Sequence, residues 1–130
     1  MKLTIPEALN RAIDAQKHGR VTEAEEIYMN ILIKFPSHPD ANHNLGVLLL
    51  NRGEKMKGVS YLKRSLVANP DIKQFWLSYL NALVDQERMI EAKKVFEQAE
   101  EKRITVDPFL KVRRALGFSE QVAQPSSKGA

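Results

Sequence analysis

Few residues of this chain have the types and spacing that catalysis or metal binding requires. Its three histidines are His18, His38 and His43, and it has no cysteine. His38 is expected in a loop and His43 in a helix, and no carboxylate pair lies near them to complete a metal site. Glu25 and Glu26 are neighbours on one predicted helix, so they do not face each other as an acid–base pair must. The sequence therefore predicts no catalytic residue, no metal site and no cofactor.

The side chains best suited to recognition are asparagines. Asn10 and Asn44 lie 34 residues apart, and Ser78 follows at the same interval. A side-chain amide can both donate a hydrogen bond to a peptide backbone and accept one from it. The regular spacing raises the question of whether the chain as a whole repeats.

The composition is that of one soluble globular domain. The 130 residues are 43% hydrophobic and 28% charged, which is enough apolar material for a packed core. The longest strongly apolar run, Val47 to Leu50, is one helical turn and cannot cross a bilayer. The N-terminus lacks the apolar region of a secretory signal, and the absence of cysteine fits a reducing compartment. We therefore expect a cytoplasmic protein without a membrane span.

The formal net charge of +4 is unevenly distributed. Basic residues gather in residues 52 to 64 and again in residues 102 to 114. Such a patch could attract an anionic partner such as RNA or DNA. No aromatic or glycine-rich nucleic-acid motif is interleaved with it, so a solvated helix face is the preferred interpretation and nucleic-acid binding is not expected.

The chain does repeat itself, with a period of 34 residues. Gly19, Gly53 and Glu87 align at this spacing, and each is followed by a small residue, a large apolar residue and a closing residue. These are Ala24, Gly58 and Ala92, then Tyr28, Leu62 and Phe96, then Pro36, Pro70 and Ile104. The pattern predicts three copies of one helical hairpin, and no segment shows the alternation of a strand.

Local signals mark where the helices begin and end. Thr4 with Glu7, and Thr22 with Glu25, have the spacing of a capping box. Gly19 can adopt the left-handed conformation that ends a helix. The starts of later units are marked by three further residues, Ser37, Pro39 and Asp71, of which Asp71 is expected to cap its helix.

These residues resemble the tetratricopeptide repeat, whose pattern is Trp-x2-Leu-Gly-x2-Tyr, then Ala-x3-Phe, then Pro. The matching positions are Ala12, Ala24, Tyr28 and Pro36 in the first unit, Leu45, Gly46, Leu62 and Pro70 in the second, and Trp76, Ala92 and Phe96 in the third. The departures are Arg11, Gly58, Glu87 and Ile104. The resemblance covers about residues 5 to 104 and implies an all-α right-handed superhelix. Trp76 is then expected in the core.

A domain of residues 1–117 is predicted, with repeats at about 5–38, 39–72 and 73–106. Residues 107–117 read as a capping helix, because Asp107 and Pro108 precede it and Gly117 follows it. Such a helix would cover the apolar end of the array. Residues 118–130 are expected to form a flexible tail.

The resemblance implies that the first helix of each unit lines a concave groove suited to an extended peptide. The groove residues implied are Leu9, Asn10, Ile13, Gln16 and Lys17, then His43, Asn44, Val47, Leu50 and Asn51, then Leu77, Ser78, Asn81, Val84 and Asp85. Asn10 and Asn44 correspond to an asparagine ladder that grips peptide backbone in arrays similar to O-GlcNAc transferases. We expect Asn44 to have no partner in its own fold and so to be dispensable for stability.

The resemblance also bears on which partner is expected. The positions of the carboxylate clamp of chaperone-binding arrays hold Leu9, Ile13, Gln74 and Ser78, and only Asn44 matches. Binding of acidic chaperone tails is therefore not expected. The sequence predicts a non-enzymatic scaffold for a protein or peptide, as a monomer or weak homodimer. The alternative is the accessory region of a glycosyltransferase or sulfotransferase, because residues 75–99 are similar to bacterial arrays that precede such domains.

Overall fold

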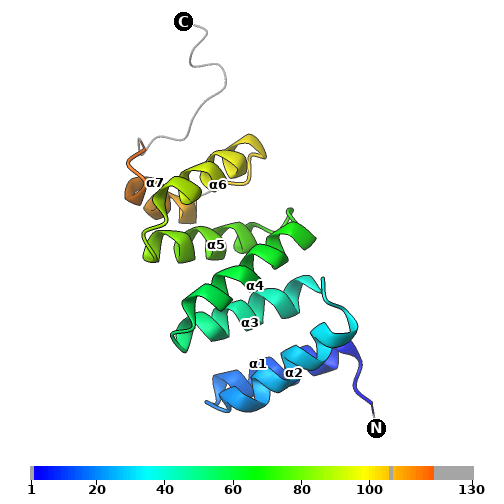
Figure 1. The fold of residues 1–130 in the computed structure, drawn as a ribbon. Coiled ribbons are helices and arrows are strands. Elements are labelled where there is room, and N and C mark those ends of the chain that lie inside the picture. The colour runs from blue at the N-terminus through cyan, green and yellow to red at the C-terminus, as the bar shows by residue number, and fades with distance from the viewer. Residues whose placement is uncertain (1, 106, 119–130) are drawn as a thin grey trace, which may run out of the picture.

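The computed structural model describes residues 2–105 and 107–118. Every regular element in these ranges is helical, as the sequence predicts (Figure 1). The elements are α1 (Ile5–Lys17), α2 (Val21–Lys34), α3 (Pro39–Asn51), α4 (Lys55–Ala68), α5 (Lys73–Asp85), α6 (Met89–Glu101), the 3-10 turn η1 (Asp107–Phe109) and α7 (Leu110–Ala115).

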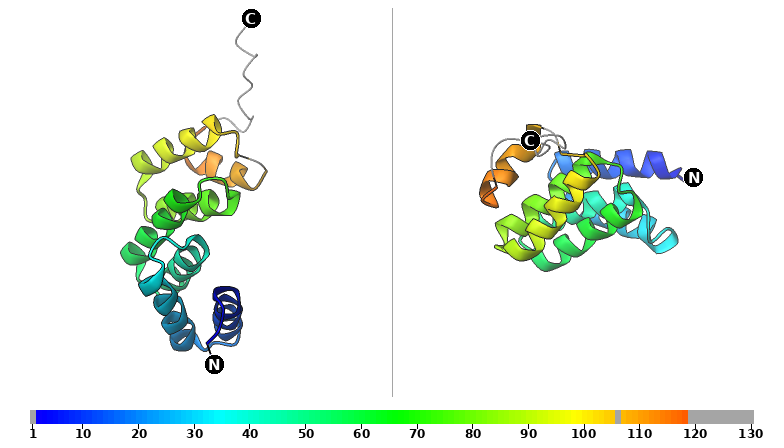
Figure 2. Two further views of the ribbon diagram at one scale, coloured as in Figure 1. Left: turned by 90° about the vertical axis from the view of Figure 1, so that its right-hand side faces the viewer. Right: turned by 90° about the horizontal axis from the view of Figure 1, so that it is seen from above.

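Helices α1 to α6 form three consecutive hairpins that stack from the N-terminal to the C-terminal end (Figure 1). The stack is curved, with the first helices α1, α3 and α5 along its inner side and α2, α4 and α6 along its outer side (Figure 2). The predicted all-α solenoid of hairpins is confirmed. We call the inner side the concave face and the outer side the convex face.

Two of the predicted helix starts are supported by side chains. At α1, the Glu7 N–H donates to Thr4 Oγ1 at 3.2 Å and the Thr4 N–H donates to Glu7 Oε1 at 2.8 Å, so the first capping box is confirmed. At α3, Pro39 occupies the first turn and His38 is the capping residue, whose Nδ1 accepts from the Ala41 N–H at 3.1 Å.

Two other predicted caps are wrong. Helix α2 begins at Val21 with Arg20 as its uncapped N-terminal residue, so Thr22 is already inside the helix. Glu25 binds the Arg52 guanidinium instead, at 2.7 Å. Helix α5 follows Ile72 without a side-chain cap, and the Asp71 carboxylate lies 3.9 Å from Lys102 Nζ. In both cases the predicted capping residue is not at the N-cap position, which is Arg20 for α2 and Ile72 for α5.

The turn inside each hairpin requires a left-handed residue. Gly19 and Gly53 have φ values of 78° and 92°, and Glu87 takes the same place with φ 58°. A residue with a Cβ atom is strained there by about 1–2 kcal/mol. The third unit therefore keeps the turn of the repeat without its glycine.

A buried donor ties each later unit to the preceding closing proline. The Asn42 amide donates to the Pro36 carbonyl at 3.0 Å, and the Trp76 indole N–H donates to the Pro70 carbonyl at 2.7 Å. Asn42 and Trp76 occupy the same position in successive units, and both are buried. The expected core position of Trp76 is confirmed.

The C-terminal segment covers the end of the array as predicted. Phe109, Val112 and Leu116 are buried in one core cluster with residues of α5 and α6. The Arg113 guanidinium pairs with Glu100 and lies 5.6 Å from the Phe96 ring centroid. Asp107 belongs to a 3-10 turn, so the predicted single helix is divided into η1 and α7.

The packed part of the chain extends one residue past the predicted boundary at residue 117. The rings of Phe96 and Phe118 stack with centroids 5.4 Å apart. The rest of the predicted tail, residues 119–130, lies outside the described residues.

Two glycines of the middle hairpin bring α3 and α4 into close contact. A Cβ atom added to Gly46 would lie 2.9 Å from Leu62 Cγ, and one added to Gly58 would lie 2.7 Å from Leu50 Cγ and 3.0 Å from the Gly46 carbonyl oxygen. Real Cβ atoms essentially never approach neighbours closer than 3.0 Å, and the 3.0 Å distance to the carbonyl oxygen is itself unusually short. The α3–α4 spacing therefore depends on the missing side chains.

We expect Gly58→Ala to destabilise the protein although it replaces a helical glycine. Better helix propensity contributes about 1 kcal/mol, but overpacking against Leu50 costs roughly 1–3 kcal/mol and adds strain against the Gly46 backbone. Urea denaturation should show a lower free energy of unfolding. Ser60→Ala, at an exposed position of the same helix, is the control and should change stability by less than about 0.5 kcal/mol. An equal or higher stability for Gly58→Ala would contradict the close contact.

Candidate functional site

A cavity of about 460 Å³ opens on the concave face between α1 and α3. Eight residues line it: Ile13, Gln16, Lys17, Tyr28, His43, Asn44, Val47 and Asn51. All except Tyr28 belong to the groove implied by the sequence. Tyr28 comes from α2, where the repeat pattern indicates a core residue, and its ring is fully buried.

The other expected groove residues lie around this cavity or beyond it. Asn10, Asn81 and Asp85 are exposed, and Leu9 is half-buried against the core of the first hairpin. Leu50, Leu77 and Val84 are half-buried and pack against the second core cluster, which lies around α5 and α6. Much of the apolar floor expected beneath α5 is therefore part of the core.

A chain of polar contacts joins α3 to α5 across the concave face. The Gln74 amide donates to Ser78 Oγ at 2.9 Å, and Ser78 Oγ lies 2.8 Å from His43 Nε2. His43 Nδ1 lies 3.2 Å from Asn44 Oδ1. The Asn44 oxygen can only accept, so His43 carries its proton on Nδ1 and its Nε2 accepts from the Ser78 hydroxyl. Ser78, expected to contact a bound peptide, is thus hydrogen-bonded within the fold.

The expectation that Asn44 is free in its own fold is wrong. Its oxygen accepts from His43, and its side chain also hydrogen-bonds to Tyr28. Burial raises the pKa of the Tyr28 phenol, and the Asn44 hydrogen bond opposes that rise in pKa. The phenol in turn donates to Gln16 Oε1 at 3.0 Å. Asn44 therefore joins α2 to α3, and its role is at least partly structural.

Two polar side chains of the cavity remain available to a ligand. Among the described residues, neither Lys17 Nζ nor the Asn51 amide has a hydrogen-bond or ion-pair partner, and both side chains are exposed. Ile13 and Val47 are half-buried and provide apolar surface beside them. The cavity thus combines an apolar wall, one amide and one ammonium group.

Other kinds of site find no support in the described part of the chain. No group of three or more His, Cys, Asp or Glu side chains there could hold a metal ion. No helix in residues 2–105 and 107–118 is long and apolar enough to span a membrane.

Comparison with solved structures settles the fold. The Sgt2 TPR domain from Aspergillus fumigatus superposes with a TM-score of 0.70 and 18% identity, over 87% of this chain and 74% of that chain. The first TPR of Spaghetti (RPAP3), bound to the HSP90 peptide SRMEEVD, gives a TM-score of 0.71 and 16% identity, over 85% of this chain and 89% of that chain. This chain has the tetratricopeptide repeat fold. No protein-family model and no curated protein matches its sequence.

The half-buried His43 of this repeat domain should make its stability depend on pH. Burial lowers the pKa of His43 below its usual value of 6.5. The unfolded chain then binds more protons than the folded one, so the His43 contribution is complete above about pH 6.5 and is lost as the pH falls through the folded-state pKa. The free energy of unfolding, measured by urea denaturation from about pH 7 to about pH 5, should decline. In His43→Gln that part of the decline should disappear, and an unchanged decline would contradict a neutral, half-buried His43.

Proposed function

We propose that this chain is a protein-interaction scaffold that holds an extended peptide in its concave groove. The observation that carries the proposal is the cavity of about 460 Å³ between α1 and α3, with available Asn51 and Lys17 side chains beside Ile13 and Val47. An extended peptide offers backbone N–H and C=O groups to an amide and alternate side chains to apolar surface. The solved TPR domain that is bound to a peptide shares the fold of this chain.

The charges of the groove argue for a peptide that is not strongly acidic. Lys17 is the one cation among the eight residues that line the cavity. Leu9, Ile13, Gln74 and Ser78 occupy the positions at which a carboxylate clamp needs its lysine, asparagine and basic partners, so a C-terminal carboxylate has no cluster of cations to bind. We infer that binding rests on backbone hydrogen bonds and apolar contacts.

The remaining parts of the proposal rest on the sequence. The scaffold is proposed to act without catalysis, in the cytoplasm, as a monomer or weak homodimer. An accessory role beside a glycosyltransferase or sulfotransferase domain stays a prediction from the sequence similarity of residues 75–99 to bacterial arrays that precede such domains.

Removal of the Asn51 side chain should weaken peptide binding without changing the stability of the fold. A random peptide display library panned on the chain provides the probe, and a selected peptide is then titrated by fluorescence anisotropy. Asn51→Ala should weaken binding about fivefold, which corresponds to roughly 1 kcal/mol for one lost hydrogen bond. Its melting temperature should stay unchanged, because the Asn51 side chain has no partner among the described residues.

Asn44→Ala is the matched control on the same helix. It removes the amide that joins His43 to Tyr28, so it should lower the free energy of unfolding by about 1 kcal/mol. Selected peptides that bind equally well to wild type, Asn51→Ala and a groove-blocking Asn51→Trp variant would contradict the proposed use of this groove.

A further inference from the structure

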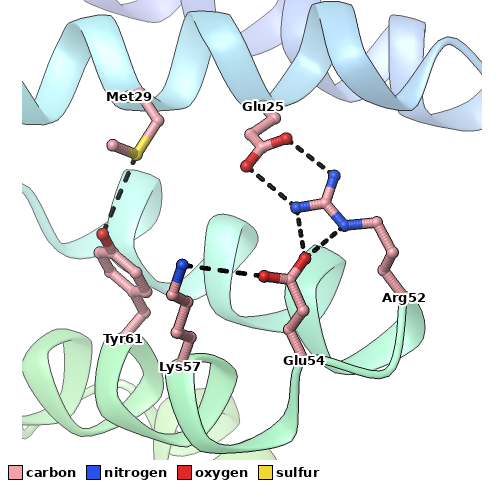
Figure 3. A network of polar contacts seen from close by, with 6 residues as sticks. All are labelled: Glu25, Met29, Arg52, Glu54, Lys57 and Tyr61. Atoms are coloured by element: carbon pink, nitrogen blue, oxygen red, sulfur yellow. Dashed lines mark hydrogen bonds and ion pairs between the residues drawn. The ribbon is translucent and has the colours of Figure 1, made fainter.

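A second cavity opens on the convex face, between α2 and α4. It has a volume of about 220 Å³ and is lined by Glu25, Met29, Leu45, Leu49, Lys57, Ser60, Tyr61 and Arg64. Leu45 and Leu49 are buried core residues of α3 and supply apolar surface within it. Figure 3 shows Glu25 and Met29 on α2 opposite Lys57 and Tyr61 on α4, with the Tyr61 hydroxyl 3.9 Å from Met29 Sδ.

A larger cavity of about 570 Å³ continues from it along α4. Its lining residues are Pro36, Ser37, Ser60, Lys63, Arg64, Val67 and Ala68. Ser60 and Arg64 line both cavities. We call the two together the α2–α4 trough.

The trough is a feature of the middle unit and not of the repeat in general. One unit later, the positions of Glu25, Leu45 and Tyr61 are held by Val59, Tyr79 and Val95. Tyr79 is larger than Leu45, and these three side chains are at most 9% exposed. The corresponding place between α4 and α6 is therefore occupied by the protein's own side chains.

At the end of the trough formed by Glu25, the positive and negative charges are paired with each other. The Arg52 guanidinium binds Glu25 at 2.7 Å and Glu54 at 2.6 Å (Figure 3). The hydrogen bond from Arg52 lowers the pKa of Glu25, so this carboxylate stays ionised and paired. This ion network holds α2 against the start of α4. It leaves no unpaired charge among these residues that a ligand would have to neutralise.

The other end carries uncompensated positive charge. Within the described residues, Lys63 and Arg64 have no carboxylate partner, and both are exposed. The Arg64 guanidinium lies 4.8 Å from the Tyr61 ring centroid, which brings it to the mouth of the apolar cavity. The equivalent residues of the third unit are Glu97 and Gln98, so the positive charge, like the trough, is particular to the middle unit.

We propose that the α2–α4 trough is a second binding site, which takes an acidic peptide segment. One aliphatic side chain of that segment enters the cavity beside Met29 and Tyr61, against Leu45 and Leu49, and a neighbouring carboxylate pairs with Arg64 and Lys63. The site shares no lining residue with the concave cavity, although α2 and α3 contribute side chains to both. Nucleic acid fits less well, because Arg64 already covers the Tyr61 ring that a base would need for stacking.

Ser60→Trp is the variant that tests occupancy of the trough. Ser60 is exposed and lines both cavities, so a large side chain there blocks the trough without entering the core. A random peptide display library is panned in parallel on the full wild-type chain and on Ser60→Trp. Peptides enriched only on wild type should carry Asp or Glu next to Leu, Ile or Met.

Charge reversal then tests the carboxylate contact with one of these selected peptides. The double variant Lys63→Glu with Arg64→Glu should bind it about tenfold more weakly or worse, and added salt should weaken binding to wild type. Lys93→Glu with Lys94→Glu, exposed on α6, changes the net charge equally and should leave affinity unchanged. Circular dichroism should show that all variants remain folded.

Three outcomes would overturn the proposal. The first is that no peptide distinguishes wild type from Ser60→Trp. The second is that the distinguishing peptides lack acidic residues, or bind both charge-reversal variants alike. The third is that a single-stranded oligonucleotide binds through Lys63 and Arg64 more tightly than the selected peptides, which would assign the basic end to nucleic acid.

Discussion

The contact between Gly46 on α3 and Gly58 on α4 is the constraint from which the rest of the arrangement follows. With no Cβ atom on either residue, the backbones approach until an added Cβ at Gly58 would lie 3.0 Å from the Gly46 carbonyl oxygen. Interiors are packed as densely as organic crystals, so helices this close leave their neighbours little freedom to shift. The middle hairpin is thus a closely packed pair of helices in the centre of the stack.

The two candidate binding surfaces lie on opposite sides of this helix pair. On the concave side, α3 presents His43, Asn44, Val47 and Asn51 to the cavity shared with α1. On the convex side, α4 presents Lys57, Ser60, Tyr61 and Arg64 to the cavity shared with α2. Polar contacts also join the middle hairpin to its two neighbours. Arg52 bonds to Glu25 of the first hairpin, and His43 bonds to Ser78 of the third.

The fold could be predicted from the sequence because it depends on local, repeated signals. The period of 34 residues identifies the hairpins, and small residues such as Ala24 and Ala92, both fully buried, mark where helices meet. Helix starts were less predictable. Thr22 and Glu25 have capping spacing, but a tight turn through Gly19 lets α2 begin at Val21, and Glu25 pairs with an arginine 27 positions away.

The site could be predicted only as far as the repeat register reaches. Register places Ile13, Val47 and Asn51 on one face, and the structure brings them to one cavity. It does not reveal that Asn44 bonds to Tyr28 of another helix, because that contact depends on how two hairpins pack. The trough was missed for the same reason. The sequence of residues 52 to 64 indicates a solvated basic face, and the opening beside them is lined by Leu45, whose counterpart one unit later is the larger Tyr79.

The claim that the concave groove binds peptide is tested most directly by amide NMR. The ¹⁵N-labelled chain is titrated with a library-selected peptide whose binding survives Ser60→Trp, so that the trough is not its site. The account predicts chemical-shift changes that cluster on α1 and α3 around Lys17, Val47 and Asn51, with little change on α4 and α6. Changes confined to the convex helices, or spread evenly over the chain, would contradict it.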